Sequence, residues 1–256
     1  MANIGQNYGL PLGNMTINAA AAGQSGTIDK DRMLDRAVAF SVATGASTPM
    51  TGVCTRFRVG GQNLIQSNGA SFPIEMLSSV SDDDGTFIGC PLKGGLTAEA
   101  NFTLDAAADT GAVIYTSDLP EGVSVTPSEE DYNWIFALGE TGALAPGAWT
   151  LNAIARRNVT LGRLVVVSVS AAGAYAGNGT FINSINVAGS EILSGTGEIP
   201  CYGAPSDNIN PFGPTANDSD GLRIDLALEA GESLTISGSS TGAVGVGIRA
   251  GVFLED

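Results

Sequence analysis

The sequence has no histidine, few charged residues and only three cysteines. Among its 256 residues charged side chains make up 14%, whereas about 25% is typical of soluble proteins. The absence of histidine removes the commonest general base and the commonest metal ligand, which excludes serine triads, Cys-His dyads and His-based zinc sites. The low charged fraction predicts a largely uncharged surface, as expected if much of it lies against other subunits.

The cysteines and the N-terminus carry no signal for a metal site or for export. Cys54, Cys90 and Cys201 are widely spaced and form no CxxC pair, so we expect three reduced and mostly buried thiols. The first residues contain neither a basic region nor an apolar region of the secretory type. No apolar run approaches the roughly 20 residues of a membrane helix, so no transmembrane segment is expected. We therefore expect a chain that is made and folded in a cytoplasm.

The charge is strongly one-sided. The formal net charge is −15, from 11 basic and 26 acidic residues. No basic stripe is present to displace counterions from phosphate, so direct contact with nucleic acid or an anionic membrane is not expected. A surplus of carboxylates keeps a self-assembling protein soluble before assembly, and this predicts that oligomers form more readily at raised salt or with divalent cations.

A nine-residue stretch occurs twice. Residues 34–42 read LDRAVAFSV and residues 161–169 read LGRLVVVSV, so the two copies are separated by almost exactly half of the chain. Self-similarity at half the chain length indicates two copies of one structural unit.

The agreement continues downstream of both copies. Residues 56–65 and 185–193 each form an apolar-alternating run, a tight small-residue turn and an apolar return, and Val59 matches Val187 if a gap of one position is allowed. Pro73 and Pro200 follow at the same separation as the two nine-residue stretches. In the first copy, Gly60 and the residues after it can take the positive-φ positions of a hairpin turn.

The apolar pattern is that of β-strands. Val38, Phe40 and Val42 alternate within residues 37–44, and the four apolar residues of 222–228 fall on alternate positions, which predicts that Leu222, Ile224, Leu226 and Leu228 share one face. Strand-like runs number about eight per unit, with turns between them. We therefore predict an all-β chain of two tandem jelly-roll β-sandwiches related by internal duplication.

The repeat also suggests domain boundaries. Residues 1–26 are rich in Gly, Asn and Ala and are interpreted as an N-terminal arm that lies on a neighbour or on its own domain. Residues 27–118 are assigned to the first jelly roll, the Pro-containing acidic segment 119–131 to a linker, and residues 132–256 to the second jelly roll.

Three acidic clusters are candidates for ligand sites. Residues 82–84 are three consecutive aspartates, residues 218–220 begin like a calcium loop, and residues 129–131 form the third cluster. None has the alternate ligands and downstream glutamate of an EF-hand, so solvated turns or a linker are preferred. Whether 82–84 and 218–220 bind a divalent cation stays open. No catalytic, cofactor-binding or metal residue is assigned, and no cofactor is expected.

Aromatic residues gather near the start of the second unit. Tyr132, Trp134, Phe136 and Trp149 lie there, and aromatic residues are only 6% of the chain. They could form a ligand platform, but core or interface packing is the preferred explanation.

The strand-turn-strand element in each half, residues 57–65 and 185–193, resembles the one that double jelly-roll major capsid proteins of tailless, membrane-containing bacteriophages carry in each barrel. The resemblance implies homotrimers whose six barrels form a pseudo-hexagonal tile of an icosahedral shell. It also implies a virion location after assembly in the host cytoplasm, with neighbouring capsomers and other virion proteins as partners. No functional residue is carried over, because the function of that family is assembly.

Three other functions compete with this interpretation. A virion decoration or spike protein would share every feature above, and a carbohydrate-binding adhesive module would need a concave aromatic face. A two-carboxylate glycosidase can work without histidine, but no spacing among Glu129, Glu130 and Asp131 singles out an acid and a nucleophile. We therefore expect that the protein is not an enzyme.

Overall fold

The computed structural model describes most of the chain, in segments separated by gaps. The described residues are 8–17, 22–41, 51–60, 62–77, 86–105, 108–123, 125, 135–169, 179–193, 197–201, 222–245 and 247–255. Within them the regular structure is β-strand, apart from one 3₁₀ turn, η1 (Ile74–Met76).

The strands fall into two groups of similar length and spacing. The first half holds β1 (Tyr8–Ile17), β2 (Ala22–Thr27), β3 (Arg32–Ser41), β4 (Gly52–Val59), β5 (Gln62–Asn63), β6 (Phe72–Pro73), β7 (Thr86–Leu92), β8 (Thr97–Leu104) and β9 (Ala108–Ser117). The second half holds β10 (Ile135–Glu140), β11 (Gly147–Ile154), β12 (Val159–Val169), β13 (Thr180–Val187), β14 (Ser190–Glu191), β15 (Ile199–Pro200), β16 (Leu222–Leu228), β17 (Ser233–Ser240) and β18 (Gly247–Glu255).

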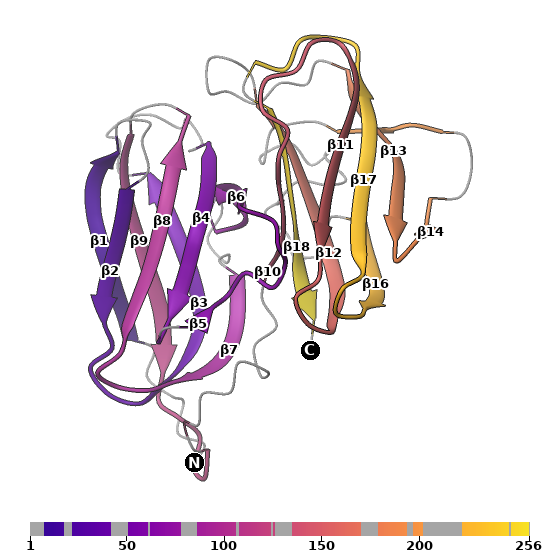
Figure 1. Ribbon diagram of the computed structural model, residues 1–256. Helices are drawn as coiled ribbons and strands as arrows, with labels where there is room; N and C mark the ends of the chain where they lie inside the picture. Colours follow the sequence, from indigo (N-terminus) through magenta and orange to yellow (C-terminus); the bar gives the residue numbers. More distant parts are fainter. Residues whose placement is uncertain are drawn as a thin grey trace.

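Each half is a sandwich of two antiparallel sheets. In the first sandwich the sheets run β1-β9-β3-β7 and β2-β8-β4-β5, with β6 also paired to β4. In the second they run β10-β18-β12-β16 and β11-β17-β13-β14, with β15 paired to β13. This interleaved order, identical in the two halves, is that of a jelly roll. Figure 1 shows the two sandwiches side by side. The predicted fold class, two tandem jelly rolls related by duplication, is confirmed.

The duplication extends to irregularities of the strands. A β-bulge puts an extra residue in one strand of a pair and is a specific structural feature, not a defect. The register shifts in the first sandwich occur at Pro11/Gly13, Leu34/Arg36 and Cys54/Arg56, and those in the second at Ala137/Gly139, Leu161/Arg163 and Ile182/Ser184. Each bulge of the first sandwich thus has a partner in the equivalent strand of the second, so the two halves match residue by residue through these strands.

The predicted hairpin is also present twice. Gly60 has φ of 61° and its amide donates to Thr97 O at 3.0 Å, while Ala188 has φ of 50° and donates to Ser233 O at 2.9 Å. Positive φ is easy for glycine but uncommon for alanine. The second turn therefore keeps the backbone of the first although its sequence is less suited to it.

The structure differs from the sequence interpretation in two places. The sequence left open whether residues 1–26 lie on a neighbour or on their own domain; residues 8–17 and 22–27 form the strands β1 and β2, paired with β9 and β8 of the first sandwich, so that sandwich includes residues before 27. Leu226 does not share the buried face of its strand and is 40% exposed. The cause is local: Asp225 has φ of 51°, and the pairing of β12 with β16 shifts register there, which turns the following side chain outward.

The aromatic side chains of the second half that are described lie in its core. Phe136 and Trp149 are buried among the apolar residues of the second sandwich. This confirms the core interpretation for these two residues, whereas Tyr132 and Trp134 lie outside the described residues.

Candidate functional site

The two sandwiches contact each other through a joint in which both halves take part. It forms where residues 64–77, which follow the first hairpin and pair with their own sheet again at β6, also run along β10 and the end of β11. Figure 1 shows β6, in the middle of this segment, between the two sandwiches. Ile65 makes a parallel bridge to Ile135, and Ser67 makes an antiparallel bridge to Ala155.

Backbone hydrogen bonds fix the register of this joint. The amide of Gln66 donates to Ile135 O at 2.9 Å, and that of Gly139 donates to Ser71 O at 2.9 Å. Asn68 bonds Ile154 twice: its amide donates to Ile154 O at 2.9 Å, and its Oδ1 accepts from Ile154 N at 2.7 Å. The segment thus satisfies the edge strand β10, whose amide and carbonyl groups would otherwise face solvent.

Two glycines permit the close approach. A Cβ on Gly69 would lie 1.9 Å from the carbonyl oxygen of Ala137, and a Cβ on Gly251 would lie 2.6 Å from Met76 Sδ. No side chain fits at Gly69 without moving backbone. Gly251 is one of several small residues among the apolar ones of residues 243–254.

A buried ion pair crosses the joint. The Arg249 guanidinium on β18 makes a bidentate contact with Asp105, which follows β8, at 2.5 Å and 2.7 Å. Its Nε donates to Glu140 on β10 at 3.0 Å. The side chains of Arg249 and Asp105 are only 3% and 7% exposed. Bidentate Arg-carboxylate pairing is directional as well as strong, so it specifies how the two sandwiches sit against each other.

The joint also shares apolar core. One cluster of buried residues combines Phe72, Ile74 and Leu77 of the first half with Ile135 and Val167 of the second. Burial of apolar surface stabilises by about 25 cal/mol per Å², and here that surface comes from both sandwiches. The described part of the chain is therefore one body with two similar halves.

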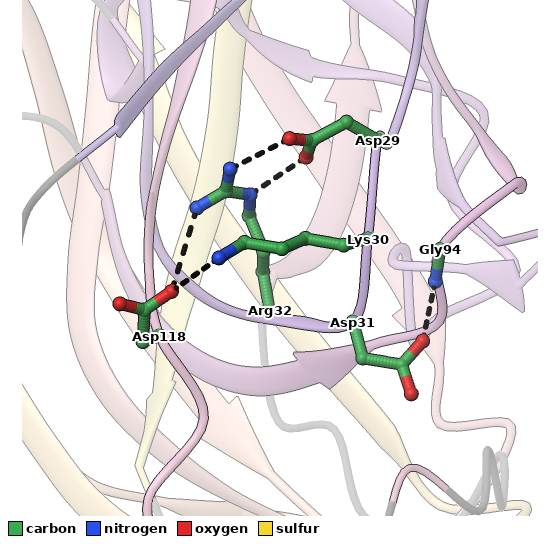
Figure 2. A network of polar contacts seen from close by, with 6 residues as sticks. All are labelled: Asp29, Lys30, Asp31, Arg32, Gly94 and Asp118. Atoms are coloured by element: carbon green, nitrogen blue, oxygen red, sulfur yellow. Dashed lines mark hydrogen bonds and ion pairs between the residues drawn. The ribbon is translucent and has the colours of Figure 1, made fainter.

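A second polar cluster lies at a corner of the first sandwich, where three chain segments meet (Figure 2). The Arg32 guanidinium makes two 2.7 Å hydrogen bonds to the Asp29 carboxylate and lies 3.8 Å from Asp118. Lys30 donates to Asp118 at 3.0 Å, and Asp31 accepts from the amide of Gly94 at 2.8 Å. The cluster ties the turn between β2 and β3 to the turn before β8 and to the end of β9.

The charges at this corner stabilise the turns that carry them. The hydrogen bond from Arg32 lowers the pKa of Asp29 from 3.8 to about 2. The carboxylate is thus held charged, the opposite of what a general acid needs near neutral pH. This corner holds turns together and is not arranged for proton transfer.

The acidic clusters considered from the sequence cannot be placed. Residues 82–84, 129–131 and 218–220 all lie outside the described residues. Within the ranges that are described, no group of three or more Cys, Asp or Glu side chains converges as a metal site would require.

The cysteines whose side chains are described are buried and free. Cys54 and Cys201 lie in the two cores. Burial raises the pKa of the Cys54 thiol far above its ordinary value and that of Cys201 to about 12. Both are therefore inert thiols, as expected for these two positions.

The residues that join the sandwiches were missed in the sequence. Asp105 and Arg249 are 144 residues apart, and no local pattern links them. One signal was available: Arg249 is the only charged residue in the apolar run 243–254, and a charge inside such a run is usually paired where it is buried.

Comparisons with known proteins gave one kind of match. No protein-family model matches the chain, and no curated protein matches it in sequence. Among solved structures, the chain is similar to the crystal structure of the major capsid protein P2 from bacteriophage PM2, with 12% identity, 98% of each chain covered and a TM-score of 0.43. The assignment of two jelly rolls rests on the strand order and registers given above. In the part of the chain that is described, no helix is long and apolar enough to cross a membrane.

Proposed function

We propose that the chain is a structural virion protein, a major capsid subunit that assembles as trimers with a pseudo-hexagonal outline. The observation that carries the proposal is the joint: two jelly rolls of identical strand order are held as one body by a shared core and the buried pair Asp105–Arg249. Three such subunits would present six similar sandwiches, which is the geometry that a hexagonally packed shell needs.

The composition supports the same role. A charged fraction of 14% and 35 glycines leave a surface of short, uncharged side chains. Depletion of charge distinguishes the central part of protein interfaces from ordinary surface. Partners would then be further copies of the chain and other virion proteins, and the site of function would be the virion.

The test is the mass of the purified protein by light scattering over a series of salt and calcium concentrations, with negative-stain images of each fraction. We expect a species of about three times 25.9 kDa with a hexagonal outline, and growth into shells as salt screens the carboxylates. A monomer that persists at every salt and calcium concentration would refute the proposal. A stable oligomer that never grows but binds a preformed shell would favour a decoration protein.

A further inference from the structure

Both elements that form the joint are repeated in the chain, but the repeated copies do not contact each other among the described residues. Residues 64–74 of the first sandwich pack on β10 of the second. The duplication gives residues 64–74 an equivalent in the second sandwich, and it gives β10 an equivalent in the first. The equivalent of the segment is residues 192–193 and 197–201, here called the counterpart segment, and the equivalent of β10 is β1.

The two segments match closely in their own sandwiches. The amide of Leu64 donates to Phe57 O at 3.0 Å, and that of Ile192 donates to Ile185 O at 2.9 Å. Next, β6 pairs with β4 and β15 pairs with β13, so that Pro73 and Pro200 occupy the same place. The two described parts of the counterpart segment therefore follow the same course beside their own sheet as the matching parts of residues 64–74 do.

The surroundings of the two segments differ. Leu64, Ile65 and Phe72 are 2%, 4% and 1% exposed and belong to the cluster of buried residues to which both sandwiches contribute. Their counterparts, residues 192, 193 and 199, are half-buried. The counterpart segment thus presents apolar side chains that are covered in the first copy.

The paired glycines show the same difference. Gly69 is where the chain passes closest to β10, and a Cβ there would lie 1.9 Å from Ala137 O. Its counterpart in the repeat is Gly197, and no atom of the described residues lies within 4 Å of a Cβ built on it. The small residue that close packing requires is therefore present, and none of the described residues packs against it.

The receiving strand is repeated as well. β1 ends its sheet as β10 ends its own, and each carries a bulge, at Pro11/Gly13 and at Ala137/Gly139. Gly139 uses its bulge to donate to Ser71 O. Gly13 occupies the same place in β1. In Figure 1, β1 lies at the left end of the subunit and β14, beside the counterpart segment, lies at the right end.

We infer that the counterpart segment docks on β1 of a second copy of this chain, as residues 64–74 dock on β10 within the chain. The contact is head-to-tail, because the two surfaces are different and lie at opposite ends of the subunit. Such contacts close into rings or continue as filaments. Closure after three copies would place six sandwiches in a ring, so the inference rests on the proposed function and supplies the surface for it.

The first test is Gly197→Trp. The open space around residue 197 lets the isolated subunit fold normally, whereas the indole would block the approach of β1. We expect self-association at least about thirtyfold weaker than that of the wild type, the scale of a central interface residue. Ala230→Trp, at an exposed turn, is the matched control and should associate like the wild type. Circular dichroism and the unfolding midpoint check that both variants fold.

The second test links the two surfaces directly. By the duplication, Leu193 corresponds to Ile65 and Gly9 to Ile135, the residues bridged inside the chain. In the double variant Gly9→Cys with Leu193→Cys, mild oxidation should produce covalent multimers on non-reducing gels. Neither single variant nor the wild type should produce them.

The outcomes separate this inference from the proposed function. If the wild type assembles, and Gly197→Trp assembles equally well without cross-linking between residues 9 and 193, the docking surface is wrong and the capsid proposal stands. A wild type that stays monomeric under all conditions, with no cross-link in the double variant, overturns both.

Discussion

The two sandwiches share one strand order, but they differ in which of two paired strands carries a large side chain. At one register position of the outer strand pair, the first sandwich places Ala22 opposite Phe102, and the second places Trp149 opposite Gly238. The large residue has changed strand. Each pair keeps one aromatic group in its core, since Phe102 is 0% and Trp149 is 4% exposed. Core volume is therefore conserved at this site even though neither residue is.

The turn between the second and third strands of each sandwich shows a second difference, in the charge of its side chains. Asp29, Lys30 and Asp31 of the first corner correspond to Arg156, Arg157 and Asn158 at the equivalent positions of the second. One contact survives: Asp31 accepts from the amide of Gly94 at 2.8 Å, and Asn158 accepts from that of Ala230 at 2.9 Å. Backbone geometry depends on an acceptor at this place, and the charge around it is free to change.

The joint is where the two halves stop being equivalent. Asp105 corresponds to Thr241, since both follow the same strand and their amides make matching hydrogen bonds to Thr51 O and Gly179 O. Arg249 corresponds to Gly111. Neither residue of the ion pair is repeated in the other half, so the duplicated positions Gly111 and Thr241 cannot form the same pair. The pair therefore stabilises one arrangement of the two sandwiches.

The largest effect is expected from Arg249→Met. This substitution leaves the buried carboxylate of Asp105 without its partner, which costs about 3–5 kcal/mol of unfolding free energy. Urea unfolding of the wild type and the variant measures the loss. The double variant Asp105→Asn with Arg249→Met should lose less than Arg249→Met alone, because no uncompensated buried charge remains at position 105. A single variant as stable as the wild type would mean that the pair does not hold the joint.

The next effect is expected from Gly238→Ala, which tests the aromatic exchange. The added Cβ would lie 1.9 Å from the backbone oxygen of Phe181 and 2.6 Å from the Trp149 ring. Overpacking of this kind costs about 1–3 kcal/mol, and a contact with backbone lies at the upper end of that range. Gly197→Ala is the control in the same sandwich, because a Cβ there meets nothing within 4 Å. The two midpoints of urea unfolding should differ clearly, and equal values would contradict the idea that Gly238 makes room for Trp149.

Some features of the two sandwiches could be predicted from the sequence and others could not. The repeat, the hairpins and the jelly-roll class were predictable because they rest on local apolar alternation and turn residues. β1 and β2 were not, since YGLPLGNMTI and AGQSGT have little β-propensity, and these strands exist through pairing with β9 and β8. The ion pair at the joint was hidden for a similar reason, because its partners meet only after both sandwiches have formed.

A smaller effect is expected from removing the acceptor that both corners share. Asp31→Ala and Asn158→Ala should each cost about 1 kcal/mol, the net value of one hydrogen bond. Asp31→Asn and Asn158→Asp each exchange one acceptor for the other and should lie close to the wild type. Chemical denaturation of the four variants gives the comparison. A large loss in only one of the Ala variants would show that the two corners do not have the same role.

The smallest effect is expected from Asp29→Asn. Asp29 is a carboxylate that the second sandwich lacks at the equivalent position. Its pKa is lowered from 3.8 to about 2, mainly by the hydrogen bond from Arg32. A lowered pKa means that the folded state favours the charged form, so the stabilisation is complete above the unfolded pKa and is lost as the pH falls through about 2. The unfolding temperature of the wild type should therefore exceed that of Asp29→Asn at neutral pH, and the difference should vanish near pH 2.

The second sandwich has Arg156 at this position, so Arg156→Gln should show no such convergence at acid pH. A difference between the wild type and Asp29→Asn that is the same at every pH would show that Asp29 acts through packing and not through its charge.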